Sequence, residues 1–185
     1  MMDVVQEAPH TVILTEDDRS MYLQATTQKV WAPQGQTPSV RVAPSREKIN
    51  FYGTLNLRTG QELVIRAEKQ TSETTAFYLN CLLETYPTVP ILLFWDRAPW
   101  HRGAAVAQVL QANPRLEIMY YPVACPELNP QEHVWKAARH EVSHNHVQDQ
   151  LPPLADQFET YLSTTVFESS LLDQYGYNAI RPMFI

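Results

Sequence analysis

Residues 90–99, PILLFWDRAP, are the stretch from which the fold can be worked out. Five consecutive apolar residues after a proline are typical of a short strand that is covered on both faces of a sheet. Strands of this kind occur in parallel sheets whose connections are helices. The run leads directly into Asp96, so a carboxylate follows the carboxyl end of a buried strand.

The segments around this strand predict alternating helices and strands. TSETTAFYLNCLLETY (71–86) has helical spacing, with Phe77, Cys81 and Leu82 on one face. RGAAVAQVLQAN (102–113) predicts a helix, and RLEIMYYP (115–122) predicts a further strand. The order helix, strand, helix, strand predicts two strands that enter one sheet parallel to each other.

The first part of the chain has the pattern of antiparallel strands. TVILTEDD (11–18) predicts a buried strand that ends in three acids, and RSMYLQAT (19–26) and KVWAP (29–33) predict antiparallel strands that continue it. NFYGTLNL (50–57) and QELVIRAE (61–68) predict the two strands of a hairpin.

Two helices complete the expected order, one over residues 129–146 and one over residues 156–175. The sequence therefore predicts an α/β fold with one five-stranded mixed sheet, three antiparallel strands followed by two parallel ones, flanked by helices. We expect residues 1–185 to form a single domain, with a motif-bearing core of about 11–146 and a helical tail of about 150–180.

Three carboxylates stand at the ends of these predicted elements. Asp17 closes the first strand, Asp96 follows the buried strand, and Glu132 opens a late helix. Because ligands of open α/β sheets gather at the carboxyl ends of strands, we expect the three to meet in one cleft. Grouped carboxylates repel each other unless cations lie among them, and oxygen ligands select hard ions such as Mg²⁺ or Mn²⁺. Singly, each acid also fits a structural role, Asp96 in a turn and Glu132 in a capping box.

A second motif, HEVSH (140–144), matches the H-E-x-x-H pattern of zinc proteases. In that pattern two histidines one helical turn apart bind Zn²⁺, and the glutamate is the general base. The motif lies at the end of its predicted helix and lacks the x-x-G-x-x-H extension, which favours an exposed helix end instead. A zinc hydrolase that uses His140, Glu141 and His144 stays as an alternative.

Composition argues against several classes of protein. No apolar run approaches the ~20 residues of a membrane span, and the first ten residues lack the layout of a signal peptide. Cys81 and Cys125 show no CxxC spacing, which predicts reduced thiols in a cytoplasmic protein. The net charge of −6 argues against bulk affinity for nucleic acid, although residues 97–140 are locally basic.

Two blocks of sequence resemble the catalytic core of bacterial insertion-sequence transposases in the mariner-like superfamily. WDRAPWH (95–101) is similar to that family's Asp-Asn-Ala-x-x-His block, and YYPVACPELNPQEHVWK (120–136) is similar to its Pro-Glu-Leu-Asn-Pro-x-Glu-x-x-Trp block. TEDD (15–18) and VWAPQGQTP (30–38) resemble the first acidic strand and the segment after it. The resemblance covers residues 11–146 in order.

The resemblance implies a ribonuclease-H-like fold and a DDE (Asp, Asp, Glu) active site formed by Asp17, Asp96 and Glu132. These residues would be both catalytic and metal-binding, holding two Mg²⁺ or Mn²⁺ ions for DNA strand cleavage and strand transfer. The neighbouring Asp18 and Glu16 stay open as alternatives for the first acid, because a shift of one residue on a strand moves a side chain to the other face. Arg97 stands where the family usually has Asn.

Basic residues within the two blocks are candidate DNA contacts, and each of them also fits a solvated surface position. They are Arg97, His101, Arg102, Lys136 and Arg139.

The resemblance also implies partners. DNA at the element's ends and at the target site is expected, in the bacterial cytoplasm near the nucleoid, and a homodimer is a further expectation. Family members usually carry an N-terminal helix-turn-helix segment, and none fits before Asp17. We therefore expect a separate helix-turn-helix polypeptide from a split reading frame. The alternative is a remnant that keeps the fold without catalysis and binds DNA or protein.

Overall fold

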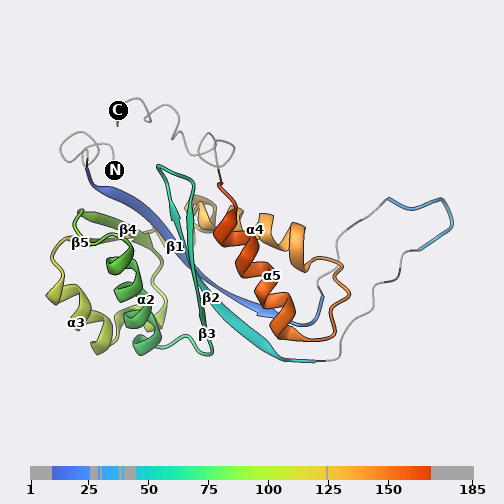
Figure 1. Ribbon diagram of the computed structural model, residues 1–185, viewed down its shortest axis with the longest axis horizontal. Helices are drawn as coiled ribbons and strands as arrows, with labels where there is room; N and C mark the ends of the chain where they lie inside the picture. Colours follow the sequence, from blue (N-terminus) through green and yellow to red (C-terminus); the bar gives the residue numbers. More distant parts are fainter. Residues whose placement is uncertain are drawn as a thin grey trace.

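The longest strand, β1 (Val12–Tyr22), lies at the centre of a five-stranded sheet with the order β3-β2-β1-β4-β5 (Figure 1). It is antiparallel to β2 (Lys48–Asn56), which pairs in turn with β3 (Glu62–Ala67). On its other side it is parallel to β4 (Ile91–Trp95), which pairs in parallel with β5 (Leu116–Tyr120). The predicted mixed sheet is confirmed.

The computed structural model describes residues 10–25, 29, 31–37, 39, 45–123 and 125–167. Within these ranges the helices lie on both faces of the sheet (Figure 1). The helical elements are α2 (Ser72–Thr85), η1 (Pro99–Arg102), α3 (Ala104–Ala112), η2 (Pro126–Leu128), α4 (Gln131–Ala138), η3 (Arg139–Ser143) and α5 (Leu151–Thr164).

The alternation of side chains along the strands divides the core in two. On one face Ile13 and Phe51 pack with α4 and α5, where Trp135 and Phe158 stack at 6.2 Å. On the other face Leu14 and its neighbours pack against α2 and α3. Each large apolar side chain buried in this way contributes roughly 1.5–3 kcal/mol of transfer free energy, so both helical layers are held firmly on the sheet.

The pairing between β1 and β4 ends early. β4 pairs with β1 only from Val12 to Thr15, whereas β2 stays paired with β1 as far as Tyr22. From Glu16 onward the described part of the chain therefore places no strand on the β4 side of β1. This free edge is the place where the acidic residues of β1 lie.

Two strand predictions are wrong. Residues 19–26 do not form a separate strand, because β1 runs without a turn to Tyr22 and keeps its pairing with β2, for example Arg19 with Phe51. For residues 29–33 the structure describes all but residue 30, and none of those described is in a strand.

Two helix predictions need correction at their ends. The helix predicted over 129–146 ends as a regular α-helix at Ala138 and continues as a single π-helical turn to Ser143. The last helix begins at Leu151 rather than at residue 156, because proline fits the first turn, where backbone N–H groups have no partner. It ends at Thr164, and residues 168–175 of the prediction lie outside the described residues.

The predicted apolar face of α2 is right for Leu82 and wrong for Phe77. Phe77 is 60% exposed, while Tyr78, Leu79 and Leu82 are fully buried against the sheet. The apolar stripe of the helix is therefore rotated by one position from the predicted one.

Both cysteines are free thiols, as expected from their spacing. None of the helices in the described part of the chain has the length and apolar character of a membrane span.

Candidate metal centre

A cavity of about 210 Å³ brings together the three predicted acids, Asp17, Asp96 and Glu132. Asp17 comes from the middle of β1, Asp96 is the first residue after β4, and Glu132 lies in the first turn of α4. Three elements that are far apart in the sequence thus direct carboxylates into the same space. The side chains of Asn129 and Tyr121 complete much of its wall.

Close packing of α4 on the sheet places Asp17 and Glu132 near each other. Trp135 donates an indole hydrogen bond of 3.1 Å from Nε1 to Asp17 Oδ2. Opposite Asp17 on β2 stands Gly53, where a Cβ atom would lie only 2.5 Å from the Trp135 ring and from Gln131 Nε2. A residue without a side chain is therefore required for α4 to approach this closely.

Asn129 fixes the start of α4 to β1. Its Nδ2 donates to the backbone carbonyl of Glu16 at 3.2 Å, and its Oδ1 accepts from the backbone N–H of Gln131 at 3.1 Å. The side chain is buried, so both bonds are shielded from water. Asn129 thus satisfies the first backbone N–H of α4, although Pro130 rather than the predicted Asn129 is the N-cap residue, and it also sets the position of Glu132 relative to the strand.

The cavity carries uncompensated negative charge. Burial, together with the charges of Glu132, Asp18 and Asp96, raises the pKa of Asp17 to about 8. On the other side of the strand, burial and the neighbouring carboxylates hold the pKa of Glu16 well above its ordinary value. Oxygen ligands in an electronegative cavity fit a hard divalent cation such as Mg²⁺ or Mn²⁺.

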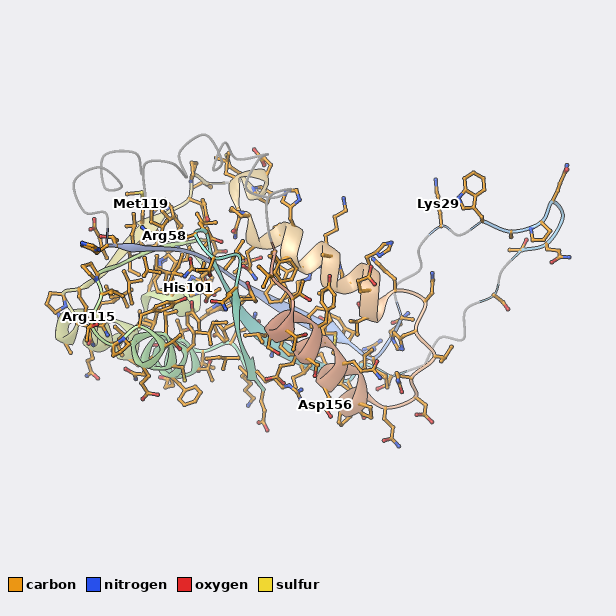
Figure 2. All side chains as sticks on the ribbon, turned by 45° about the horizontal axis from the view of Figure 1, so that its top comes forward. Lys29, Arg58, His101, Arg115, Met119 and Asp156 are labelled. Atoms are coloured by element: carbon orange, nitrogen blue, oxygen red, sulfur yellow. The ribbon has the colours of Figure 1, made fainter. Side chains whose placement is uncertain are left out.

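The opposite face of β1 holds a second, buried group of ionisable side chains around His101. The imidazole stacks on the Trp95 ring with the centroids 4.3 Å apart, inside the molecule (Figure 2). Its Nδ1 lies 3.1 Å from Asp96 Oδ1, and its Nε2 lies 3.8 Å from both Glu16 Oε2 and Asp18 Oδ2. His101 therefore lies between the cavity of Asp17, Asp96 and Glu132 and the acids on the opposite face of β1.

The bond from His101 orients Asp96. Since an ionised carboxylate can only accept, Nδ1 must carry the proton that it donates. This hydrogen bond is the main reason why the pKa of Asp96 lies below its ordinary value. Asp96 is thus ionised and held in one orientation, although its side chain is 53% exposed.

Asp18 accepts its side-chain hydrogen bonds outside the cavity. Its Oδ2 accepts a hydrogen bond of 2.7 Å from Trp100 Nε1, and its Oδ1 accepts one from Gln70 Nε2. Of the three candidates for the first acid, only Asp17 lines the cavity with Asp96 and Glu132. Among the described residues, Glu16, Asp18 and His101 also form a group whose potential ligand atoms lie within 4.8 Å of one another.

The zinc interpretation of HEVSH does not fit the structure. Residues 139–143 form a π-helical turn, and His144 beyond it has an extended backbone, with φ −78° and ψ 133°. The two histidines are therefore not one α-helical turn apart. His140 Nδ1 contacts Glu141 Oε1 at 3.0 Å, and no group of three metal-ligating side chains in the described ranges contains these residues.

The predicted DNA contacts fall in different environments. Arg97, Arg102 and Lys136 are exposed; Arg97 lies over the Tyr120 ring at 4.7 Å, and Arg102 donates to the Arg97 carbonyl at 2.6 Å. Arg139 is half-buried. His101 is only 2% exposed, so a direct contact with DNA does not fit its position.

The sequence assigns no role to Gly53 or Trp135, and it leaves Glu16 open only as an alternative first acid. Trp135 follows Glu132 by three residues, a helical spacing that places both on one face, so this signal was available. The need for Gly53 depends on the register between β1 and β2, which no local pattern reveals.

Comparison with solved structures identifies the fold as ribonuclease-H-like. The chain is similar to the Mos1 transposase paired-end complex with left transposon end, with TM-score 0.66 and 14% identity, over 99% of this chain and 56% of that one. It is also similar to the catalytic domain of Mos1 mariner transposase, with TM-score 0.61 and 11% identity, over 99% of this chain and 84% of that one. The structure is thus a ribonuclease-H-like domain with three carboxylates in one cavity.

Sequence comparison gives the family. Residues 12–152 match the DDE superfamily endonucleases, and the chain belongs to that family. A relative, the insertion element IS630 uncharacterized 39 kDa protein of Shigella sonnei, is 27% identical over 140 residues, which is 75% of this chain and 40% of that protein. The chain therefore spans less than half of this relative.

Two substitutions of His101 should distinguish the roles of its two ring nitrogens. Asn places its amide nitrogen near the position of Nδ1 and can still donate to Asp96, whereas Gln reaches toward Glu16 and Asp18. We expect His101→Gln to weaken Mn²⁺ binding by about tenfold or more, the usual cost of losing a residue that orients a ligand, and His101→Asn to weaken it much less. Mn²⁺ titration followed by electron paramagnetic resonance measures this. Equal weakening in both variants would contradict the role of Nδ1.

The raised pKa of Asp17 predicts a pH-dependent stability in metal-free protein. Between the unfolded pKa of 3.8 and the folded pKa of about 8, the folded state binds a proton that the unfolded state has lost. Stability should therefore fall as pH rises through this range. In EDTA at pH 8, we expect Asp17→Asn to be more stable than the wild type by roughly 1 kcal/mol or more, with little difference at pH 4.

Urea denaturation across this pH range measures the effect. The charge of Asp17 also helps to raise the pKa of Glu16, so the difference between the two slopes measures Asp17 together with its repulsion of Glu16. Parallel stability curves for the two proteins would show that Asp17 titrates normally.

Proposed function

We propose that this chain is the catalytic domain of a DNA transposase, which cleaves and joins DNA strands by metal-dependent phosphoryl transfer. The observation that carries the proposal is the meeting of Asp17, Asp96 and Glu132 in one cavity on a ribonuclease-H-like sheet. Membership in the DDE superfamily endonucleases supports the reaction class. The similar Mos1 complexes contain transposon-end DNA, which supports DNA as the substrate.

In the proposed centre, Asp17, Asp96 and Glu132 would hold two Mg²⁺ or Mn²⁺ ions. The raised pKa of Asp17 and the all-oxygen donor set fit this role. Similar crystal structures of the Mos1 mariner paired end complex are described with Mn and with Mg, at TM-scores of 0.64 and 0.65. Bound ions of this kind activate an attacking water or 3′-hydroxyl and stabilise the leaving oxygen.

The chain's own residues supply position and charge. His101 holds Asp96 in one orientation, and Trp135 does the same for Asp17. The exposed side chains of Arg97, Arg102 and Lys136 are proposed to contact phosphates of the DNA. A reaction with little covalent participation of the protein depends on such positioning and on charge compensation.

The proposed partners follow from this role. They are the ends of a mobile element, the target DNA, a helix-turn-helix polypeptide that reads those ends, and a second copy of the chain. The proposed location is the bacterial cytoplasm, where the free thiols of Cys81 and Cys125 stay reduced.

Replacing single acids of the cavity by their isosteric amides tests the proposal. Asp96→Asn and Glu132→Gln should each reduce Mn²⁺-dependent nicking of supercoiled plasmid by at least about 100-fold, the scale of losing one group that stabilises transition-state charge. Melting curves without metal should show folded variants. The matched control is Glu117→Gln, an exposed acid on β5, which should nick DNA like the wild type.

Nicking at the wild-type rate by either amide variant would contradict the assignment of that residue. A wild-type protein that binds DNA but does not nick it with Mn²⁺ or Mg²⁺ would instead indicate the non-catalytic module.

A further inference from the structure

A second and larger cavity, of about 590 Å³, continues along the free edge of β1. The last residues of β1, including Arg19 and Ser20, form one side of it, and Arg139 and Ser143 of the π-helical turn form another. Asp18 also belongs to its wall, so this cavity begins one residue away from Asp17 of the metal centre. We call it the edge cavity.

Two arginines of the edge cavity have no acidic partner. Within the described residues, neither Arg19 nor Arg139 forms an ion pair with a carboxylate. Arg139 Nη1 is buried and has no hydrogen-bond partner in that part of the chain. Arg66 shows the contrasting case on β3, because its guanidinium is paired with both Asp156 and Glu159.

The two guanidinium groups are close enough to interact. Burial and the charge of Arg19 both lower the pKa of Arg139, while the charge of Glu132 raises it. Arg139 is therefore within electrostatic range of both the second arginine and the metal centre. The one acid in the wall, Asp18, already accepts hydrogen bonds from Trp100 and Gln70.

Two like charges that are partly buried, with neither of them paired to a carboxylate, cost free energy. An anion bound between them would remove this cost. The planar guanidinium fork matches the oxygens of a phosphate group better than those of a halide or a single carbonyl. The chemistry of the edge cavity therefore fits a phosphate.

We propose that Arg19 and Arg139 together bind one backbone phosphate of the DNA strand, next to the phosphate that lies at the three carboxylates. This inference rests on the proposed function and adds the position of the substrate strand, along the free edge of β1. Contacts to phosphate carry no sequence information, so the edge cavity holds DNA of any sequence. Arg139 was a candidate from the sequence, and Arg19 was not.

The test uses Arg19→Gln, Arg139→Gln and the double variant, with Arg66→Gln as the matched control. All remove positive charge, but the charge of Arg66 is already balanced by two acids. Binding to a fluorescent DNA duplex is measured by anisotropy over a range of NaCl concentrations in Ca²⁺. Each edge-cavity variant should bind about tenfold more weakly, with a salt slope smaller by about 1, because one phosphate contact is lost.

Two further results are expected if both arginines bind the same phosphate. The loss in the double variant should be smaller than the product of the single losses, since either substitution disrupts the shared contact. Without DNA, each single variant should melt at or above the wild-type temperature, because the repulsion between the arginines is relieved. Arginines with a purely structural role would lower the melting temperature.

The proposal is overturned if both edge-cavity variants bind DNA as well as Arg66→Gln does, with unchanged salt slopes. DNA nicking is measured on the wild type from the same preparation. If the wild type nicks DNA, this outcome overturns the phosphate site but not the proposed function. If the wild type never nicks DNA but both edge-cavity variants bind DNA more weakly than it does, the results would support the phosphate site and contradict catalysis.

Discussion

Four carboxyl groups lie close together where the pairing between β1 and β4 ends. The need to balance their negative charge constrains the residues around them. Glu16 and Asp18 point to one side of β1, Asp17 points to the other, and Asp96 lies at the end of β4. The protein provides these acids with the imidazole of His101, two indole N–H groups, the side-chain amide of Gln70 and the backbone N–H of Ala98. The negative charge on the cavity side is not compensated by these groups. A divalent cation would be its natural counter-charge.

The packing of α4 on the sheet adds Glu132 to these acids and so completes the proposed site. Gly53 lets the helix approach β2, Asn129 ties its first turn to β1, and Trp135 reaches Asp17. Glu132 is thereby placed in the same cavity as Asp17 of β1 and Asp96, which follows β4. The helix continues into the π-helical turn that begins with Arg139, so one element supplies both a proposed metal ligand and a proposed phosphate contact.

The sequence predicted the alternation of helices and strands after residue 71 and the meeting of the three acids in one cavity, because both depend on local patterns. The catalytic and metal-binding roles of these acids stay predictions. The apolar run before Asp96 and the block around Glu132 are short-range signals. The continuation of β1 to Tyr22 could not be predicted in this way, since its three acids look like the end of a strand while cross-strand pairing keeps it extended. The same applies to Arg19 and Gly53, whose roles depend on which residues lie opposite them. The HEVSH motif failed as a zinc site because a π-helical turn changes the spacing that the pattern assumes.

Anomalous diffraction from crystals grown with Mn²⁺ tests the central claim most directly, because it locates the ion without assuming any activity. The account predicts anomalous density in the cavity lined by Asp17, Asp96 and Glu132, and its loss in Asp96→Asn. Density located instead among Glu16, Asp18 and His101, or density in the first cavity that persists in Asp96→Asn, would contradict it.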